Sequence, residues 1–272
     1  MSEQKVGFFS DLDQTLIYSS KNVELTLSKV NFNGLVVVET NKEHPASYMT
    51  LQAILNLAKI SHLSHFIPTT TRINDQYRRI SFPNANIEYA ITTNGAVILH
   101  NGEPDKGWTN TIKKQLEGSI EPVDKVFEFW SNLTKDTLWV KNLNKANGFF
   151  IYFVVDRNEM PYHFLEELEN KAEEWNYKLS IQGRKIYFIP KFLTKGYAVQ
   201  EVSERLGIDY IISAGDSNLD KTMLTIADYA LRPAHGGLHE DDFTAENLIV
   251  TDNYGINAGE EILSKVLHRI LN

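Results

Sequence analysis

The segment Lys5–Ser10, with the sequence KVGFFS, limits the folds open to this chain more than any other stretch does. After Lys5 its residues are apolar or small, without the alternation of polar and apolar side chains that is typical of a half-exposed strand. Such a run predicts a parallel strand that is covered on both faces. Two carboxylates, Asp11 and Asp13, follow directly. A buried strand that ends in acidic residues predicts a ligand site at the carboxyl edge of a sheet.

The outer parts of the chain alternate segments with strand patterns and segments with helix patterns. Thr50, for example, is expected to cap a helix in which Leu51, Ile54 and Leu55 recur at helical spacing. The segment 65–72, HFIPTTTR, follows as a short strand that ends in hydroxyls and an arginine. The other segments with such patterns are 34–50, 88–98, 193–207, 209–220, 228–233, 247–252 and 258–271. Strands and helices in alternation predict an α/β fold, doubly wound around a mainly parallel, Rossmann-like sheet.

The middle of the chain, residues 98–184, has a different pattern. Two amphipathic helices precede two strands, and a third helix then precedes two more strands. Such helix-strand-strand units predict an antiparallel sheet covered on one face. We therefore expect a core domain formed by residues 1–97 and 185–272, interrupted by an inserted α+β cap domain at residues 98–184. The Asn94-Gly95 pair is a turn signal where the chain would leave the core.

The amino-acid composition argues against some classes of binding partner. The 272 residues are 42% hydrophobic and carry a formal charge of −8, whereas nucleic acids and anionic membranes require a basic face. No apolar run approaches the roughly 18 residues of a membrane helix, and the first residues, MSEQKVGFF, lack the apolar core of a signal peptide. The absence of cysteine fits a reducing cytosol. We expect a cytoplasmic protein with no nucleic-acid or membrane partner, and the sequence leaves its oligomeric state open.

Four polar clusters lie where ligands bind in α/β sheets, beyond the carboxyl ends of the strands. They are Asp11 with Asp13, Thr69 to Arg72, Lys195 at the start of its helix, and Asp216 with Asp220. Convergence of several carboxylates is unfavourable unless protons or a cation compensate. Because the chain offers oxygen ligands and no thiolate, the favoured cation is Mg2+.

The same groups are suited to phosphoryl transfer. Lys195 supplies a positive charge and Thr70 a hydroxyl donor for a phosphate group. One of the two aspartates after the first strand can act as the nucleophile, forming an aspartyl phosphate that splits a difficult hydrolysis into two easier steps. Its neighbour can protonate the leaving alcohol and then deprotonate the attacking water. These two roles explain why the two carboxylates are separated by a single residue.

These residues resemble the motifs of the haloacid dehalogenase (HAD) superfamily of phosphohydrolases, and the resemblance covers the whole chain. The four motifs appear in order as FFSDLDQTL, FIPTTTR, LTKGYAV and ISAGDSNLDKTML. The insert resembles the C2-type cap of Cof-like and sucrose-phosphate-phosphatase-like members. The resemblance implies a Mg2+-dependent phosphatase that works through an aspartyl phosphate.

The resemblance also implies a role for each motif residue. Asp11 is expected to be the nucleophile and Asp13 the general acid/base, while Thr70 and Lys195 complete the catalytic group by holding the transferring phosphoryl group. The expected Mg2+ ligands are the carboxylates of Asp11 and Asp216 and the backbone carbonyl of Asp13. The expected substrate-binding residues are Thr70, Thr71, Arg72, Asn94, Gly95 and Lys195. The residues expected to support or orient these groups are Thr15, Ser217, Asn218 and Asp220.

Two positions depart from the pattern of the superfamily. Gln14 stands where many members have glycine, and Leu219 stands where Cof-like members usually carry asparagine, so that Ser217 or Asn218 would take its place. Thr70 is preferred over the adjacent threonines because Arg72 then aligns with the arginine of the common TGR form.

The sequence predicts an enzyme that hydrolyses a small phosphorylated metabolite, for example a sugar phosphate. One alternative is a phosphotransferase or phosphomutase, which passes the aspartyl phosphate to another hydroxyl group. Another is a non-catalytic protein that binds a phosphorylated ligand, and the presence of Asp11, Asp13 and Lys195 argues against it. A metal pair at His235 and His239 is also conceivable, but a polar loop is the favoured interpretation of that stretch.

Overall fold

The computed structural model describes residues 4–24 and 34–272. Its contacts divide the chain into unit 1, Met1–Pro104 with Lys195–Asn272, and unit 2, Asp105–Thr194. Both divisions lie later in the chain than the expected boundaries after residues 97 and 184. The first is later because β7 (Val97–His100) pairs with β6 (Tyr89–Thr92) and β8 (Glu103–Pro104). The second is later because β12 (Lys185–Pro190) pairs with both β10 (Phe150–Val155) and β11 (Tyr177–Gln182) of unit 2.

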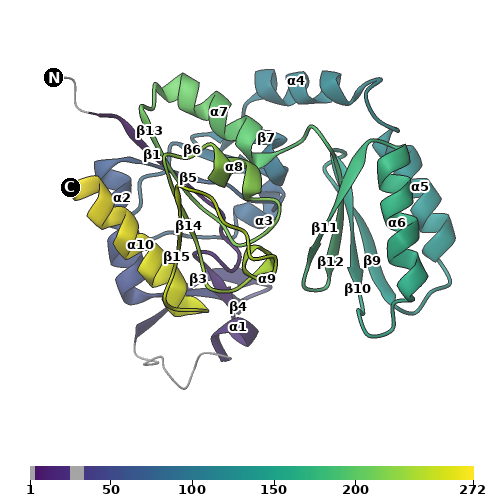
Figure 1. The fold of residues 1–272 in the computed structure, drawn as a ribbon, viewed down its shortest axis with the longest axis horizontal. Coiled ribbons are helices and arrows are strands. Elements are labelled where there is room, and N and C mark those ends of the chain that lie inside the picture. The colour runs from purple at the N-terminus through teal and green to yellow at the C-terminus, as the bar shows by residue number, and fades with distance from the viewer. Residues whose placement is uncertain (1–3, 25–33) are drawn as a thin grey trace. The chain divides into compact units, whose positions relative to one another are not determined.

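The centre of unit 1 is a parallel sheet in the order β15-β14-β13-β1-β5 (Figure 1). Its strands are β1 (Val6–Ser10), β5 (His65–Pro68), β13 (Tyr210–Ala214), β14 (Tyr229–Arg232) and β15 (Leu248–Val250). The predicted apolar strand thus forms β1 and lies between β5 and β13, where both of its edges are paired. The predicted parallel core is confirmed.

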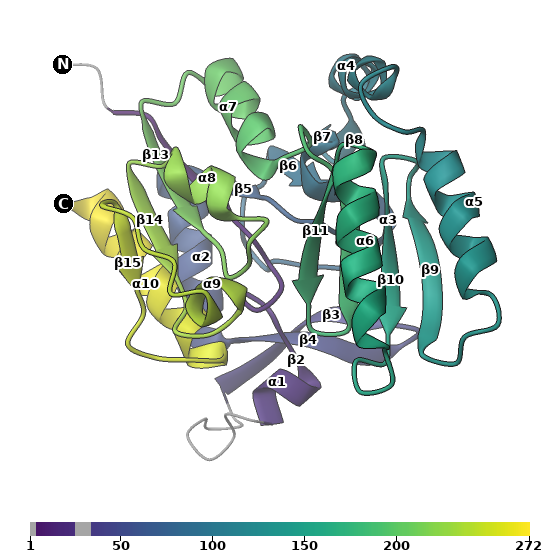
Figure 2. The ribbon, with the colours of Figure 1, turned by 45° about the vertical axis from the view of Figure 1, so that its right-hand side comes forward.

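Helices cover both sides of this sheet, with α2 and α10 on one side and α7 and α8 on the other (Figure 2). The helices of unit 1 are α1 (Ser20–Glu24), α2 (Leu51–Leu63), α3 (Asn74–Tyr77), α7 (Lys195–Leu206), α8 (Lys221–Thr225), α9 (Gly237–Glu240) and α10 (Ile256–Leu271). Thr50 caps α2 as predicted, since its hydroxyl accepts from the Ala53 N–H at 3.1 Å. Lys195 opens α7, also as predicted.

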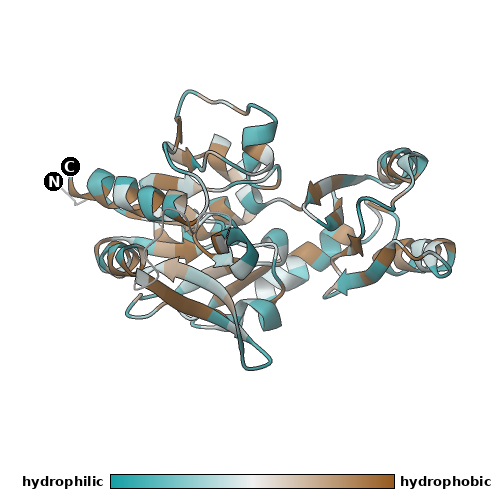
Figure 3. Ribbon diagram, turned by 90° about the horizontal axis from the view of Figure 1, so that it is seen from below, coloured by the Kyte–Doolittle hydropathy of each residue, from teal (hydrophilic) through white to brown (hydrophobic). Residues whose placement is uncertain are grey.

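The core of unit 1 is formed by apolar faces that meet between the sheet and its helices. Phe8 of β1, Leu57 of α2 and Leu263 of α10 belong to one buried cluster. Figure 3 shows hydrophobic colour along the strands and a mixture of colours along the helices, as expected for helices with one face in solvent. A smaller antiparallel sheet lies in the order β2-β4-β3, with β2 (Tyr18–Ser19), β3 (Leu35–Asn41) and β4 (His44–Thr50). The predicted hairpin at 34–50 is therefore present.

Unit 2 has the predicted α+β pattern. Its antiparallel sheet runs β11-β12-β10-β9 and is covered on one face by two helices, so that Trp130 packs against Phe153, Phe164 and Phe188. The elements are α4 (Lys106–Leu116), α5 (Val123–Thr134), β9 (Val140–Ala146), β10 (Phe150–Val155), α6 (Tyr162–Glu174), β11 (Tyr177–Gln182) and β12. All of the tryptophans, Trp108, Trp130, Trp139 and Trp175, lie in this unit.

Among the described residues, none of the helices combines the length and the apolarity that crossing a membrane requires.

Candidate active site

The candidate site lies at the carboxyl ends of three neighbouring strands of the parallel sheet. Asp11 follows β1, Thr70 follows β5 and Asp216 follows β13. Because β1 is hydrogen-bonded to both β5 and β13, Asp11 lies between the other two in the strand order. Its backbone N–H extends the ladder by donating to the carbonyl of Ala214 at 2.8 Å. The sheet therefore brings together loops from positions far apart in the sequence, as the pattern predicts.

Lys195 is held in the site by two carboxylates. Its side chain is 1% exposed, and its Nζ lies 2.5 Å from Oδ1 of Asp11 and 2.6 Å from Oδ1 of Asp220. Burial opposes a positive charge, but the carboxylates of Asp11 and Asp220 prevail and raise the pKa of Lys195 above its usual value. The lysine is a fixed cation next to the Asp11 carboxylate.

Asp220 is saturated by hydrogen bonds from the protein. One of its oxygens accepts from Lys195, and Oδ2 accepts from the N–H of Asp216 at 3.1 Å, the N–H of Ser217 at 2.8 Å and the hydroxyl of Ser217 at 2.8 Å. Gly215 leaves the space for this loop, because a Cβ at that position would lie 2.4 Å from Cβ of Asp220. Asp220 is thus placed to orient Lys195 and the loop that carries Asp216.

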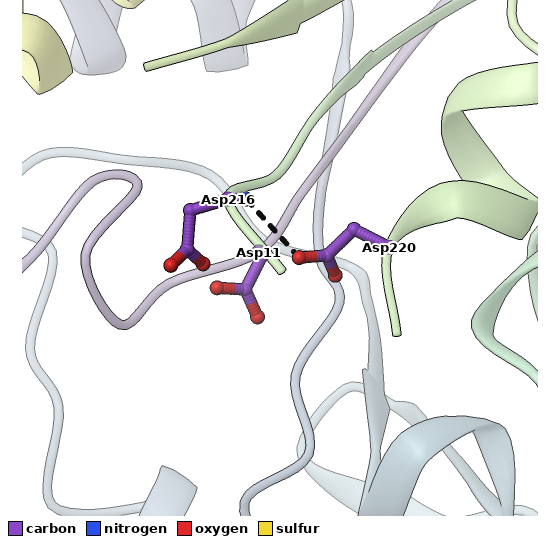
Figure 4. A group of neighbouring side chains, drawn as sticks. All are labelled: Asp11, Asp216 and Asp220. Atoms are coloured by element: carbon purple, nitrogen blue, oxygen red, sulfur yellow. Dashed lines mark hydrogen bonds between the residues drawn. The ribbon is translucent and has the colours of Figure 1, made fainter. Parts of the chain in front are cut away.

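Asp11 and Asp216 are less well satisfied. One hydroxyl, that of Thr15, lies near an oxygen of each carboxylate. The distances are long, 3.4 Å to Oδ2 of Asp11 and 3.5 Å to Oδ1 of Asp216. Figure 4 shows both carboxylates converging with Asp220, and one oxygen from each of the three lies within 4.8 Å of the others. These oxygen donors have the hardness and negative charge that suit a divalent cation such as Mg2+.

The pKa values of these carboxyl groups also support a cation site. Burial raises the pKa of the Asp11 carboxyl to about 7, with nearby Asp220 and Asp13 adding to the rise and Lys195 opposing it. Burial and the charges of Asp11 and Asp220 raise the pKa of Asp216 well above its usual value. A bound cation would remove this repulsion and favour the charged carboxylates.

The metal-free protein is expected to lose stability as the pH rises. Folded Asp11 keeps its proton up to a pH of about 7, whereas the unfolded carboxyl releases it near 3.8. Between these values the folded state binds more protons, so the free energy of unfolding falls as the pH rises through that window, by on the order of a few kcal/mol. Urea unfolding in EDTA, followed across the window, measures this slope.

Asp11→Asn provides the control for that experiment, because it removes this titration and leaves the other groups in place. We expect a shallower slope in the variant, and a flatter one in wild type when Mg2+ is added. Identical slopes for wild type and Asp11→Asn in EDTA would contradict the assignment.

The carboxylate of Asp13 is paired with Arg72. Arg72 donates to both of its carboxylate oxygens, from Nε at 2.7 Å and from Nη2 at 2.8 Å. Arg72 also contacts Glu39 of β3, with Nη2 at 3.0 Å from Oε2 and Nη1 at 2.8 Å from Oε1. The side chain of Glu39 is 3% exposed and accepts further from Ser47 at 2.6 Å. Sequence reasoning singled out Arg72 but missed Glu39, for which the acidic side chain in the otherwise apolar run LVVVE was the available signal.

Thr70 lies beside the loop that contains Asn94 and Gly95. Its hydroxyl oxygen accepts from the Arg72 N–H at 3.1 Å, so its own proton is directed elsewhere. The backbone carbonyl of Thr70 accepts from the Asn94 N–H at 3.0 Å. Asn94 and Gly95 have φ values of 55° and 99°, so the loop turns in the left-handed region. The structure thus places these residues together, with Thr71 half-buried beside them.

The residues around Asp216 separate into two groups. Ser217 contacts Asp220, as described above, whereas the Asn218 amide donates to Oδ2 of Asp241 at 2.7 Å. Of the two expected replacements for the missing asparagine, only Ser217 therefore contacts an aspartate of the site.

His235 supports the loop after β1. Its Nδ1 accepts from the Gly255 N–H at 3.1 Å, so its Nε2 donates to the carbonyl of Gln14 at 2.8 Å. This carbonyl belongs to Gln14, whose φ of 63° lies in the left-handed region that favours glycine. Both ring nitrogens of His235 are engaged, and Nδ1 of His239 lies 3.0 Å from Arg232. The polar-loop interpretation of these histidines agrees with this geometry.

Solved structures with the same fold include several phosphatases. One is the sucrose-phosphatase of Synechocystis in complex with sucrose and phosphate, with 15% identity, 97% of this chain and 98% of that chain covered, and a TM-score of 0.67. The C-terminal domain of the C. albicans trehalose-6-phosphate phosphatase has 14% identity, coverage of 97% and 92%, and a TM-score of 0.58. A subclass IIB sugar phosphatase of the HAD superfamily has 15% identity, coverage of 98% and 100%, and a TM-score of 0.54.

A search of curated proteins gives no significant match. The family model for sucrose-6F-phosphate phosphohydrolase, in contrast, matches residues 4–231, which include every motif singled out in the sequence. The chain therefore belongs to the sucrose-6F-phosphate phosphohydrolase family of HAD phosphatases.

Proposed function

We propose that this protein hydrolyses a small phosphorylated sugar through an aspartyl phosphate on Asp11, with Mg2+ as the cofactor. The observation that carries the proposal is the environment of Asp11. Its carboxylate stands at the end of the central strand, beside the buried cation of Lys195. Among the described residues, the other oxygen accepts only the distant Thr15 hydroxyl. A buried nucleophile next to a positive charge is suited to attack an anionic phosphate.

The first half-reaction would form the covalent intermediate. A carboxylate oxygen of Asp11 attacks phosphorus while the bond from phosphorus to the leaving oxygen breaks, and Asp13 gives its proton to that oxygen. Lys195 and the Thr70 hydroxyl stabilise the charge on the phosphoryl oxygens. The products of this step are the sugar and an aspartyl phosphate.

The second half-reaction would release phosphate. The Asp13 carboxylate takes a proton from a water molecule whose oxygen attacks phosphorus, and the bond between phosphorus and Asp11 breaks. Inorganic phosphate and the free Asp11 carboxylate result, with Asp13 protonated again. One aspartate bonds to phosphorus and the other moves the protons.

The pairing of Arg72 with Asp13 would weaken when Asp13 is protonated. The oxygen that carries hydrogen is a poorer acceptor than a carboxylate oxygen, so the two N–H groups of Arg72 are held less firmly. Glu39 already contacts the same guanidinium and stays available as its acceptor. Glu39 would therefore hold Arg72 in place while Asp13 gains and loses its proton.

The expected holders of Mg2+ are the carboxylates of Asp11 and Asp216 with the backbone carbonyl of Asp13. The bound ion would supply positive charge that offsets both the carboxylates and the phosphate oxygens. The poorly satisfied oxygens of Asp11 and Asp216 fit this role, whereas Asp220 already accepts hydrogen bonds at both of its oxygens.

A sugar as the leaving group is supported by the family model and by the structures of similar fold. The family is that of sucrose-6F-phosphate phosphohydrolase, and the similar structures include a sucrose-phosphatase and a trehalose-6-phosphate phosphatase. The HAD fold by itself supports many substrates, so the leaving group has to be tested directly.

Phosphate release from a panel of sugar phosphates, nucleotides and aryl phosphates tests the proposed function. We expect release from sugar phosphates with Mg2+, loss of at least about 100-fold in EDTA and recovery when Mg2+ is restored. Full activity in EDTA would contradict the metal assignment. Transfer of the phosphoryl group to added sugars, without free phosphate, would instead favour the phosphotransferase alternative.

A further inference from the structure

Residues 235–238, which follow β14 and lead into α9, contact two loops of the candidate active site. On one side, Nε2 of His235 lies 2.8 Å from the carbonyl oxygen of Gln14, in the loop after β1. On the other side, the N–H of Leu238 donates to the carbonyl of Asp216 at 2.9 Å, in the loop after β13. We call residues 235–238 the bridging segment. All of these contacts lie within unit 1.

Gly236 brings the bridging segment directly against Asp216. Its φ of 84° lies in the left-handed region that favours glycine. A Cβ at this position would lie 2.7 Å from the carbonyl oxygen of Asp216 and 2.7 Å from its Oδ2, which is closer than non-bonded atoms approach. The bridging segment therefore packs against the backbone and the carboxylate of an expected Mg2+ ligand.

The bridging segment also holds Gln14, whose backbone is strained. A side chain at a φ of 63° is unfavourable, and such a conformation persists only where neighbouring groups hold it. The N–H of Gln14 donates to the carbonyl of Ile17 at 2.9 Å, and its carbonyl accepts from His235. Because the N–H of Gln14 and the carbonyl of Asp13 belong to one planar peptide group, holding Gln14 also fixes the direction of the Asp13 carbonyl.

His235 is the stronger of two side-chain donors to the Gln14 carbonyl. The other is the hydroxyl of Tyr18 at 3.0 Å, but its single proton is shared with the carbonyl of Thr15 at 3.1 Å. The proton of His235 lies on Nε2, because Nδ1 accepts from the N–H of Gly255, the residue that directly precedes α10. Burial lowers the pKa of the His235 ring and so favours this neutral form.

We propose that His235 is a positioning residue for the Mg2+ site, because it holds the Gln14 carbonyl from a segment that also contacts Asp216. Its ring thereby fixes the loop of Asp13 relative to the loop of Asp216, and both loops carry expected Mg2+ ligands. Hydrogen-bond partners that orient metal ligands in this indirect way change metal affinity by about 10- to 100-fold when they are removed. The inference rests on the proposed function, because it concerns the ion that the proposed reaction uses.

Two substitutions separate the two hydrogen bonds of the His235 ring. The amide of His235→Gln can place an N–H where Nε2 lies, whereas the shorter amide of His235→Asn can replace only the Nδ1 acceptor. We expect His235→Asn to weaken Mg2+ binding about 10- to 100-fold and His235→Gln to stay within about threefold of wild type. Recovery by the variant that keeps the donor would distinguish this hydrogen bond from simple packing of the ring.

The affinity for Mg2+ is measured on the whole protein without substrate. Protein stripped of metal with EDTA is titrated with Mg2+, and the rise of the thermal unfolding midpoint gives the dissociation constant. The midpoint of each variant before Mg2+ is added verifies that it folds. His239→Asn is the control, because His239 is exposed on the same short helix and contacts Arg232 rather than Gln14. Its affinity for Mg2+ is expected within about twofold of wild type.

Two results would overturn the proposal, namely equal Mg2+ affinity in wild type and His235→Asn, or equal losses in His235→Asn and His235→Gln. If His235→Asn does not fold, Tyr18→Phe removes the second donor to the same carbonyl and keeps an aromatic ring. Binding weakened at least about threefold in Tyr18→Phe then supports the proposal, and unchanged binding overturns it.

The titration also separates this inference from the proposed function. If no sugar phosphate is hydrolysed but wild type binds Mg2+ more tightly than His235→Asn does, the proposed function fails and the role of His235 stands. If sugar phosphates are hydrolysed with Mg2+ while His235→Asn binds the ion as tightly as wild type, the proposed function stands and the role of His235 is wrong. The absence of any stabilisation of wild type by Mg2+ also overturns that role.

Discussion

Replacement of Asp11 by asparagine is expected to lower kcat by about 10⁴-fold or more. The amide cannot form the aspartyl phosphate, although it occupies nearly the same volume as the carboxylate. The variant should fold, because it removes one negative charge from a cluster in which Asp216 and Asp220 remain opposite the single cation of Lys195. Steady-state turnover with the best sugar phosphate measures the loss, and thermal unfolding verifies the fold.

Asp209→Asn is a matched control for Asp11→Asn. Asp209 immediately precedes β13, at the opposite end of the strand from Asp216, and its carboxylate accepts from the backbone N–H of Lys5 at 3.0 Å. The same chemical change there is expected to leave kcat unchanged within about twofold. Activity of Asp11→Asn close to that of Asp209→Asn would rule out covalent catalysis at Asp11.

Lys195→Met is expected to abolish activity and to destabilise unit 1 by about 3–5 kcal/mol at neutral pH. Methionine has a similar length but leaves the carboxylates of Asp11 and Asp220 buried without the cation that lies 2.5 and 2.6 Å from them. The destabilisation should shrink as the pH falls, because protonation then neutralises these carboxyl groups. Urea unfolding followed by circular dichroism measures the loss at each pH.

Lys265→Met provides the comparison for an ordinary ion pair. Lys265 lies on α10 and contacts Glu261 at 3.4 Å, one helical turn earlier, with a side chain that is 33% exposed. Surface pairs of this kind contribute about 0.3–0.5 kcal/mol. If Lys195→Met lost no more stability than Lys265→Met, the structural role of the buried lysine would be wrong.

The fold was predictable because its signals are local and repeated. The apolar run before Asp11 predicted a central parallel strand, the helical spacing after Thr50 predicted α2, and the Asn94-Gly95 pair marked a turn. Each depends on periodicity or on a preference of one or two residues. The exact limits of the insert were not predictable, because β12 looks like any apolar strand until its pairing with β10 and β11 is known.

The site was predictable in outline for a related reason. Parallel strands end at one edge of the sheet, so Asp11 and Asp216 were expected to converge, and the structure places them together. The pairing of Asp13 with Arg72, and of Arg72 with Glu39, was not predictable, because Arg72 and Glu39 are 59 and 26 residues away from Asp13 and no periodicity links them. Such pairings depend on how the hairpin of β3 and β4 folds back onto the loop after β5.

The position of the tryptophans allows fluorescence to distinguish the two units. Unit 1, which holds the candidate active site, has no tryptophan, whereas unit 2 has all of them, with Trp130 fully buried against aromatic neighbours. Intrinsic tryptophan emission therefore reports on unit 2, while circular dichroism reports on both units. Where the two signals change at different urea concentrations, the units unfold separately, and a defect at Lys195 registers in one signal before the other.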